Sequence, residues 1–186
     1  MMNDLFEWDE LNLIREETKR IMSLPPEERI KQKDTYCDYL EFVLCLVYGY
    51  GWKDAESVVG IVPFKDGLDD ICVNLEIDNK TWRERAEEYL QDGTEAEMIR
   101  LIDTESVRDY NTGVTDAGKA SGTLGLKKRW NTQLDWKVRD AHMELEGMTV
   151  GIDDLFYSGE DAAYAPGGFS DPSLNCNCRC YLTLQT

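Results

Sequence analysis

The chain has 186 residues, of which 42% are hydrophobic and 10% aromatic, and this composition excludes a disordered chain. Its formal net charge of −17 excludes a protein that binds the nucleic-acid backbone through clustered cations. Residues 126–186 carry six Lys/Arg against nine Asp/Glu, giving −3, so residues 1–125 carry 14 against 28, giving −14. The acidic part is expected to serve solubility, to meet a basic protein surface, or to act as a DNA mimic.

No membrane partner is expected. The longest apolar run, residues 42–48, is far too short to cross a bilayer. The first residues are acidic and lack the positive segment of a secretory signal. We therefore expect the six cysteines to be reduced rather than paired in disulfides.

The first part of the chain is predicted to be mainly helical. Apolar spacing predicts a helix over residues 9–24, ended by Pro25-Pro26, and a second from residue 26 to about 48. Gly49 and Gly51 are expected to end it, with a further short helix over residues 54–59. Residues 71–77 have the pattern of an extended segment.

Two capping boxes follow, each a threonine with a glutamate three residues later. Thr81 and Glu84 predict a helix that ends near residues 92–93, and Thr94 and Glu97 predict one that runs to about Ala120.

From residue 126 the pattern changes to short elements. It predicts a strand at 128–132, a helix at 135–145, an extended piece at 148–152, a loop at 159–172 and a closing strand at 178–184. The fold class is therefore α+β, with an acidic helical region at residues 1–92 and, at residues 93–186, a small α+β domain with a short antiparallel sheet.

Two sets of polar residues repeat at helical spacing. Glu105, Arg108 (or Asp109) and Asn111 (or Thr112) share one face, which spacing alone favours as solvated surface over a buried hydrogen-bond network. Asp135, Arg139 and His142 would share another face if residues 135–145 are helical, and Asp135 would then pair with Arg139. His142, the single histidine, is expected to be structural rather than a general base or metal ligand.

Three alternate cysteines close the sequence, and His142 with Cys176, Cys178 and Cys180 forms a candidate zinc set. Alternate side chains of a strand lie about 6.6 Å apart. Sulfurs on one tetrahedral zinc lie less than about 4 Å apart, so at least one cysteine would have to leave the strand. Zinc is thus the alternative to free thiols.

Catalytic signatures are missing. The sequence contains no phosphate-binding Gly-rich loop, nucleophile elbow or His-Glu-x-x-His motif. We expect no catalytic residues, with a Cys/His enzyme as an alternative recognised by one fast-alkylating thiol.

One ordered set of motifs runs through the second half of the chain. It consists of the Glu-x-x-Arg helix face at residues 105–108, Lys128-Arg129-Trp130, Asp135, Arg139-x-x-His142, Leu145-x-Gly147, Pro166-Gly167 and Asn177-Cys178-Arg179-Cys180. Over about residues 95–184 this order resembles the Mu-F-like phage minor head protein family. Only about 90 residues precede it, and Cys176 is additional to the family's usual pair.

The resemblance implies a structural or assembly component of the bacteriophage head, present in few copies near the portal. It implies a location in the virion head, reached through the host cytoplasm, with the portal or major capsid protein as partner and no sequence-specific nucleic-acid binding. It also implies one internal polar cluster, comprising Glu105, Arg108, Asn111, Asp135, Arg139, His142, Asn177 and Arg179. Such domains also occur fused to toxins, so a toxin-associated domain and a zinc-stabilised binding module remain alternatives.

Overall fold

The structure is a computed structural model that describes residues 8–64 and 80–186. The helices of its first part are α1 (Asp9–Met22), α2 (Pro26–Lys31), α3 (Lys33–Val59), α5 (Trp82–Asp92) and α6 (Glu95–Ala120). The later elements are β1 (Lys127–Asn131), α7 (Asp140–Met143), β2 (Thr149–Gly151), β3 (Phe156–Ser158), β4 (Asp161–Ala163), α8 (Pro172–Asn175) and β5 (Tyr181–Gln185). The predicted α+β class is confirmed.

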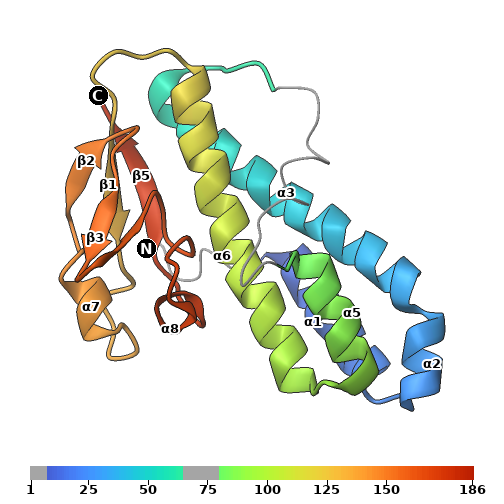
Figure 1. Cartoon of the computed structure of the whole chain (residues 1–186). Coiled ribbons are helices and arrows are strands. Elements are labelled where there is room, and N and C mark those ends of the chain that lie inside the picture. Colours follow the sequence, from blue (N-terminus) through green and yellow to red (C-terminus); the bar gives the residue numbers. More distant parts are fainter. Residues whose placement is uncertain (1–7, 65–79) are drawn as a thin grey trace.

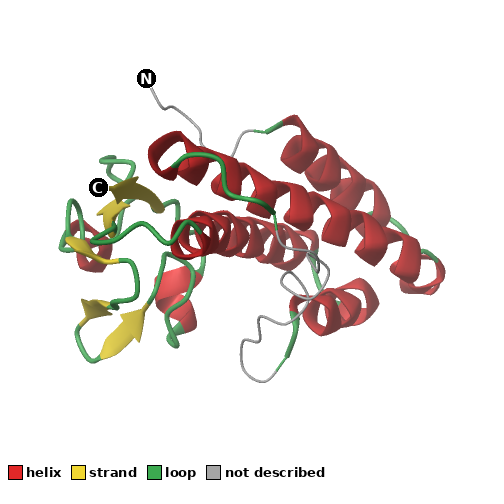
Figure 2. Cartoon of the chain, turned by 90° about the horizontal axis from the view of Figure 1, so that it is seen from above, coloured by secondary structure: helices red, strands yellow, loops and turns green. Residues whose placement is uncertain are grey.

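Helix α6 separates two layers. The helices α1, α3 and α5 lie on one side of it, and the strands gather on the other (Figure 1). The view from above shows the same division, with the strands grouped beside the helices (Figure 2). Helix α6 therefore connects the helical layer to the sheet.

Both predicted capping boxes are present. The Thr81 hydroxyl accepts a hydrogen bond from the Glu84 backbone N–H, and the Glu84 carboxylate accepts one from the Thr81 N–H. Thr94 and Glu97 repeat this arrangement at the start of α6. These reciprocal bonds satisfy backbone donors that a helix start leaves unpaired.

The predicted second helix is divided differently. Helix α2 ends at Lys31, and α3 continues through Gly49 and Gly51 to Val59, so the expected break at these glycines is wrong. Tertiary packing explains the continuation. A Cβ on Gly51 would lie 2.0 Å from the Tyr110 carbonyl oxygen, so the missing side chain lets α3 approach the backbone of α6.

The approach is reciprocal, because a Cβ on Gly113 of α6 would lie 2.1 Å from the Tyr48 carbonyl oxygen of α3. The two helices therefore cross in backbone contact. The extended segment expected at residues 71–77 lies outside the described residues.

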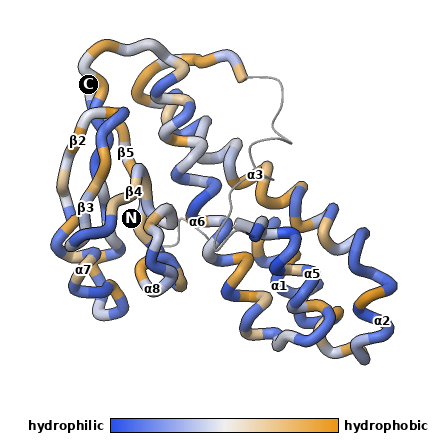
Figure 3. Tube along the Cα trace, viewed as in Figure 1, coloured by the Kyte–Doolittle hydropathy of each residue, from blue (hydrophilic) through white to orange (hydrophobic). Residues whose placement is uncertain are grey.

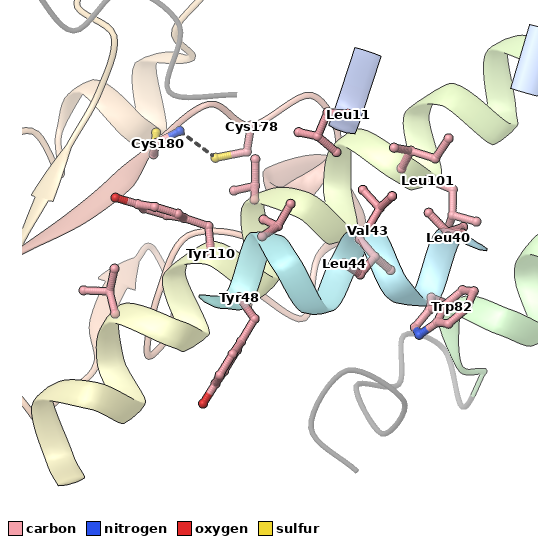
Figure 4. Close-up of a cluster of buried hydrophobic side chains, with 14 of the residues drawn as sticks. Leu11, Leu40, Val43, Leu44, Tyr48, Trp82, Leu101, Tyr110, Cys178 and Cys180 are labelled. Carbon is pink, nitrogen blue, oxygen red and sulfur yellow. Dashed lines mark hydrogen bonds between the residues drawn. The ribbon is translucent and has the colours of Figure 1, made fainter. Parts of the chain in front are cut away.

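One buried apolar cluster joins the elements. Leu11 from α1, Leu44 from α3, Trp82 from α5 and Leu101 from α6 all belong to it (Figure 4). Apolar and hydrophilic stretches are interspersed along these helices, as expected where one face packs inward (Figure 3).

Among the described residues, no helix has the length and apolar character needed to cross a membrane. The division of the chain into an acidic helical region at residues 1–92 and a domain at residues 93–186 stays a prediction.

The main sheet has the strand order β2-β1-β5, and both pairings are antiparallel. Its inner face continues the core, because Trp130 of β1 pairs with Leu182 of β5 and both side chains are buried. A separate hairpin joins β3 to β4.

Three predictions for this part need correction. The helix expected at residues 135–145 is limited to Asp140–Met143, because the Asp135 carboxylate accepts the Lys137 N–H and forms a turn instead. The loop expected at 159–172 contains β4 and leads into α8. The closing strand begins at Tyr181 rather than at residue 178, after Asn177 adopts a left-handed conformation with φ 55°.

Candidate functional site: a buried polar and Cys/His centre

The polar face of α6 is buried, so its interpretation as solvated surface is wrong. Glu105 is 1% exposed and accepts hydrogen bonds from Arg85 at 2.6 Å and Arg108 at 2.8 Å. The Arg108 Nε donates to the Gly167 carbonyl oxygen at 3.0 Å. This network holds α5, α6 and the loop before α8 together, and Arg85 is a member that no sequence pattern indicated.

Asn111 connects α6 to the segment at the start of β5. Its side-chain oxygen accepts the Leu182 N–H at 2.8 Å, and its amide nitrogen donates to the carbonyl oxygens of Cys180 at 3.2 Å and Val107 at 2.7 Å. The residue is completely buried. One side chain therefore fixes the position of β5 against the helix.

Asp109 lies next to these residues and is also buried. Burial, reinforced by the nearby Glu105 carboxylate, raises the pKa of Asp109 well above its usual range. Its Oδ2 has no hydrogen-bond partner among the described residues. A protonated carboxyl avoids the cost of burying an unpaired negative charge.

The second predicted set does not share a helical face. Asp135 forms an ion pair with Arg179 at 2.6 Å instead of pairing with Arg139, and the hydrogen bond from Arg179 lowers the pKa of Asp135. The side chains of this ion pair are more than a third exposed, which places them at the surface rather than in a buried cluster. The Arg139 guanidinium donates to the Cys176 carbonyl oxygen, so it anchors the turn after α8.

Asn177 contributes through its backbone. Its left-handed conformation turns the chain between Cys176 and Cys178, which directs the cysteines that follow toward α7. Asparagine tolerates this conformation better than most residues. The feature could not be inferred from the alternating cysteine pattern, which indicated a regular strand.

His142, Cys178 and Cys180 converge in the interior. The His142 Nδ1 lies 3.7 Å from the Cys178 sulfur and 3.4 Å from the Cys180 sulfur. The Cys180 backbone N–H also points to the Cys178 sulfur at 3.4 Å (Figure 4). All three side chains are 3% exposed or less, and their candidate ligand atoms lie within 4.8 Å of one another. The sulfur of Cys176 does not belong to this group.

The surroundings of this cluster are aromatic. The His142 ring contacts Trp130 edge-on at 5.8 Å and stacks with Phe169 at 6.2 Å between centroids. The hydrogen bond between the two thiols, together with His142, lowers the pKa of Cys178 well below its usual range. The same bond and burial raise the pKa of Cys180. Without a cation between them, the two thiols thus accommodate one thiolate more readily than two.

Lys128 is a further buried charged residue, which the sequence indicated only as part of the Lys128-Arg129-Trp130 motif. It occupies an inward-facing position of β1, and its Nζ has no hydrogen-bond partner among the described residues. The ammonium group lies 5.7 Å from the Phe156 ring and 5.1 Å from the Tyr164 ring. Burial lowers the pKa of Lys128 to about 8. The alternation of β1 could have indicated it, since residues 128 and 130 share one face.

These contacts define a small α+β domain in which a long helix, a three-stranded sheet and a buried Cys/His cluster are joined by polar side chains. Residues 77–183, more than half of the chain, match the family described as Phage Mu protein F like protein. The chain belongs to this family, as the resemblance predicted.

Two curated relatives match part of the chain. It is 30% identical over 97 residues to the NAD(+)–arginine ADP-ribosyltransferase EFV of Enterococcus faecalis, covering 50% of this chain and 20% of that protein. It is 32% identical over 72 residues to the Minor head protein GP7 of Bacillus phage SPP1, covering 37% of this chain and 23% of that protein. The matches thus span less than a quarter of either relative. No solved structure matches the chain.

Proposed function

We propose that this chain is a structural or assembly component of the bacteriophage head, a minor head protein. The observation that carries the proposal is the family match over residues 77–183, which includes α6, most of the sheet and the Cys/His cluster. The name of the Bacillus phage relative, Minor head protein GP7, supports the same role.

In this role the chain catalyses no reaction. The Cys/His cluster, the arrangement that resembles a nucleophile with its base, is closed to substrate because each of its three side chains is 3% exposed or less. The transferase activity in the name of the Enterococcus relative stays with that protein, of which the match covers only 20%. The polar residues of α6 are engaged in holding elements together.

The proposed partner is the portal or the major capsid protein, met in the host cytoplasm during assembly and retained in the virion head. The helical layer supplies a suitable surface, because large apolar side chains are exposed on it among many carboxylates: Leu13, Ile30 and Phe42 are 60%, 48% and 58% exposed. A basic patch with an apolar centre would complement this surface.

The test is mass spectrometry of density-purified procapsids and phage particles from an induced host culture. The chain is expected in both at a few copies per particle. Procapsids assembled without portal distinguish the partners, since loss of the chain from them identifies the portal. A chain that is abundant in the soluble fraction but missing from every particle type would contradict the structural role and leave only an assembly factor.

A further inference from the structure

The spacing of His142, Cys178 and Cys180 has the dimensions of a metal site. Zinc bonds of about 2.3 Å to sulfur and about 2.0–2.1 Å to nitrogen, at tetrahedral angles, place a sulfur and a nitrogen ligand about 3.6 Å apart. The two sulfur-to-Nδ1 distances are 3.7 and 3.4 Å. Both distances are close to this value, and the candidate ligand atoms of the three residues all lie within 4.8 Å of one another.

Hydrogen bonding alone satisfies this arrangement less completely. A neutral imidazole offers one acceptor nitrogen, and here both sulfurs face the same Nδ1. That lone pair accepts from one thiol while the other thiol bonds to its neighbour, whereas an ion at the centre of the three atoms bonds to all of them.

We propose that His142, Cys178 and Cys180 bind a zinc ion that fastens α7 to the segment before β5. Two thiolates and one neutral imidazole balance the charge of Zn²⁺, which suits a site buried among aromatic rings. Thiolate and imidazole ligands favour zinc over the hard cations magnesium and calcium. The inference does not depend on the proposed head function.

A small hollow of about 10 Å³ is lined by the three ligands and by Val138, Arg139 and Asn177, among others. That volume holds about one water molecule. Cys176 lies outside the ligand group, although the sequence pattern included it as a fourth candidate. The ion is thus held by three side chains with solvent as its fourth ligand, in a site too closed for a substrate.

The first experiment measures metal content. The full chain is produced without a polyhistidine tag, kept reduced, and analysed for zinc by mass spectrometry after dialysis. One zinc per chain is expected. Replacement by Co²⁺ should give the near-ultraviolet absorption of a cobalt–thiolate bond. No bound metal, either as purified or after addition of Zn²⁺ or Co²⁺ to the reduced chain, would overturn the proposal.

Variants identify the ligands. Cys178→Ser, Cys180→Ser and His142→Ala should each weaken zinc binding by more than about a hundredfold, beyond the 10- to 100-fold typical of residues that only support a ligand. Cys176→Ser, a neighbouring thiol in the same segment, is the matched control and should keep both the zinc and the cobalt–thiolate absorption. Equal zinc loss in Cys176→Ser would overturn the three-residue ligand set.

Misfolding is separated from loss of a ligand by the conservative variant His142→Cys, which replaces nitrogen by sulfur and should retain zinc. A chelator should lower the melting temperature of the starting chain and of Cys176→Ser, but leave that of His142→Ala unchanged, because that variant has no ion to lose. A chelator effect of equal size in His142→Ala would contradict the assignment.

Discussion

Asn111 shows how much one side chain contributes to this domain. Its amide bonds to α6 and to both Cys180 and Leu182, so it closes the gap between the helix and the last strand. Removing it leaves the Leu182 N–H and the Cys180 carbonyl buried, and each buried polar group without a partner costs about 1–3 kcal/mol.

Asn111→Ala is therefore expected to lower the free energy of unfolding by about 2–4 kcal/mol. The measurement is the denaturant midpoint, followed by circular dichroism. Asn12→Ala, at an exposed asparagine of α1, is the control and should stay within about 0.5 kcal/mol of the starting chain. Equal midpoints for the two variants would contradict the bridging role of Asn111.

Lys128, in contrast to Asn111, is expected to lower the stability of the fold. Its buried ammonium has ring contacts but no hydrogen-bond partner among the described residues, and replacing a buried charge by an apolar group of similar length often stabilises a protein. Lys128→Met should raise the free energy of unfolding at pH 7 by about 1 kcal/mol or more. Lys127→Met, at the exposed neighbour on the same strand, should change little.

The advantage of Lys128→Met should depend on pH. Because the folded-state pKa of Lys128 is about 8 and the unfolded value is about 10.4, the unfolded chain binds more protons between these values. The free energy of unfolding of the starting chain therefore increases relative to that of the variant as pH rises from about 8 to about 10.4. The stability advantage of Lys128→Met becomes smaller over this range. Urea titrations at several pH values measure this, and a constant difference would contradict the assignment.

At the scale of elements, the crossing of α3 and α6 depends on glycine. Gly113→Ala would place a Cβ 2.1 Å from the Tyr48 carbonyl oxygen, so the helices would have to separate. We expect a loss of about 3 kcal/mol or more, at the upper end of the cost of overpacking. Thermal unfolding measures the effect.

The matched control is Gly49→Ala, in the same helix as Gly51 but with open space around its Cβ position. Alanine favours the helix over glycine by about 0.5–1 kcal/mol, so this variant should be neutral or more stable. A similar loss in both variants would contradict close packing as the cause, because the Cβ position of Gly49 has open space around it and alanine favours the helix.

Secondary structure could be predicted from the sequence where the signal is local, and the prediction was wrong at the glycines of α3. The capping boxes at Thr81 and Thr94 are local signals that involve residues three apart, and both helix starts were predicted from them. Gly49 and Gly51 carry a local signal for a helix end, which the contact with α6 overrides. Packing between residues far apart in the chain is not encoded in a spacing pattern.

For the candidate site, the residues were predicted better than their partners. Glu105, Arg108 and Asn111 were identified, but the burial of their helix face depends on β5 and the loop before α8, which lie far along the chain. Helical spacing suggested an ion pair between Asp135 and Arg139. In the structure, residues 135–138 form a turn instead, and Asp135 forms its ion pair with Arg179.

At the scale of the whole molecule, the dominant property is the net charge of −17. Repulsion among carboxylates destabilises a compact state, and salt weakens it because the Debye length falls from about 30 Å at 0.01 M to about 8 Å at 0.15 M. The melting temperature should therefore rise over this range of NaCl. The rise should shrink near pH 4.4, where the chain carries little net charge. A fall in melting temperature at neutral pH would indicate that attractive ion pairs outweigh the repulsion.

The position of β5 has a consequence for how the protein is made. A ribosome completes α6 long before it adds Leu182, which follows Asn111 by 71 residues. At about 5–20 residues per second, that interval lasts roughly 4–14 s, during which the face of α6 that β5 will cover is open to water. Asn111 keeps part of this face hydrophilic, and Glu105 and Arg108 do the same where Arg85 and the Gly167 loop pack. The polar side chains that later join the helix to the sheet thus also reduce aggregation of the nascent helix with other chains before β5 is synthesised.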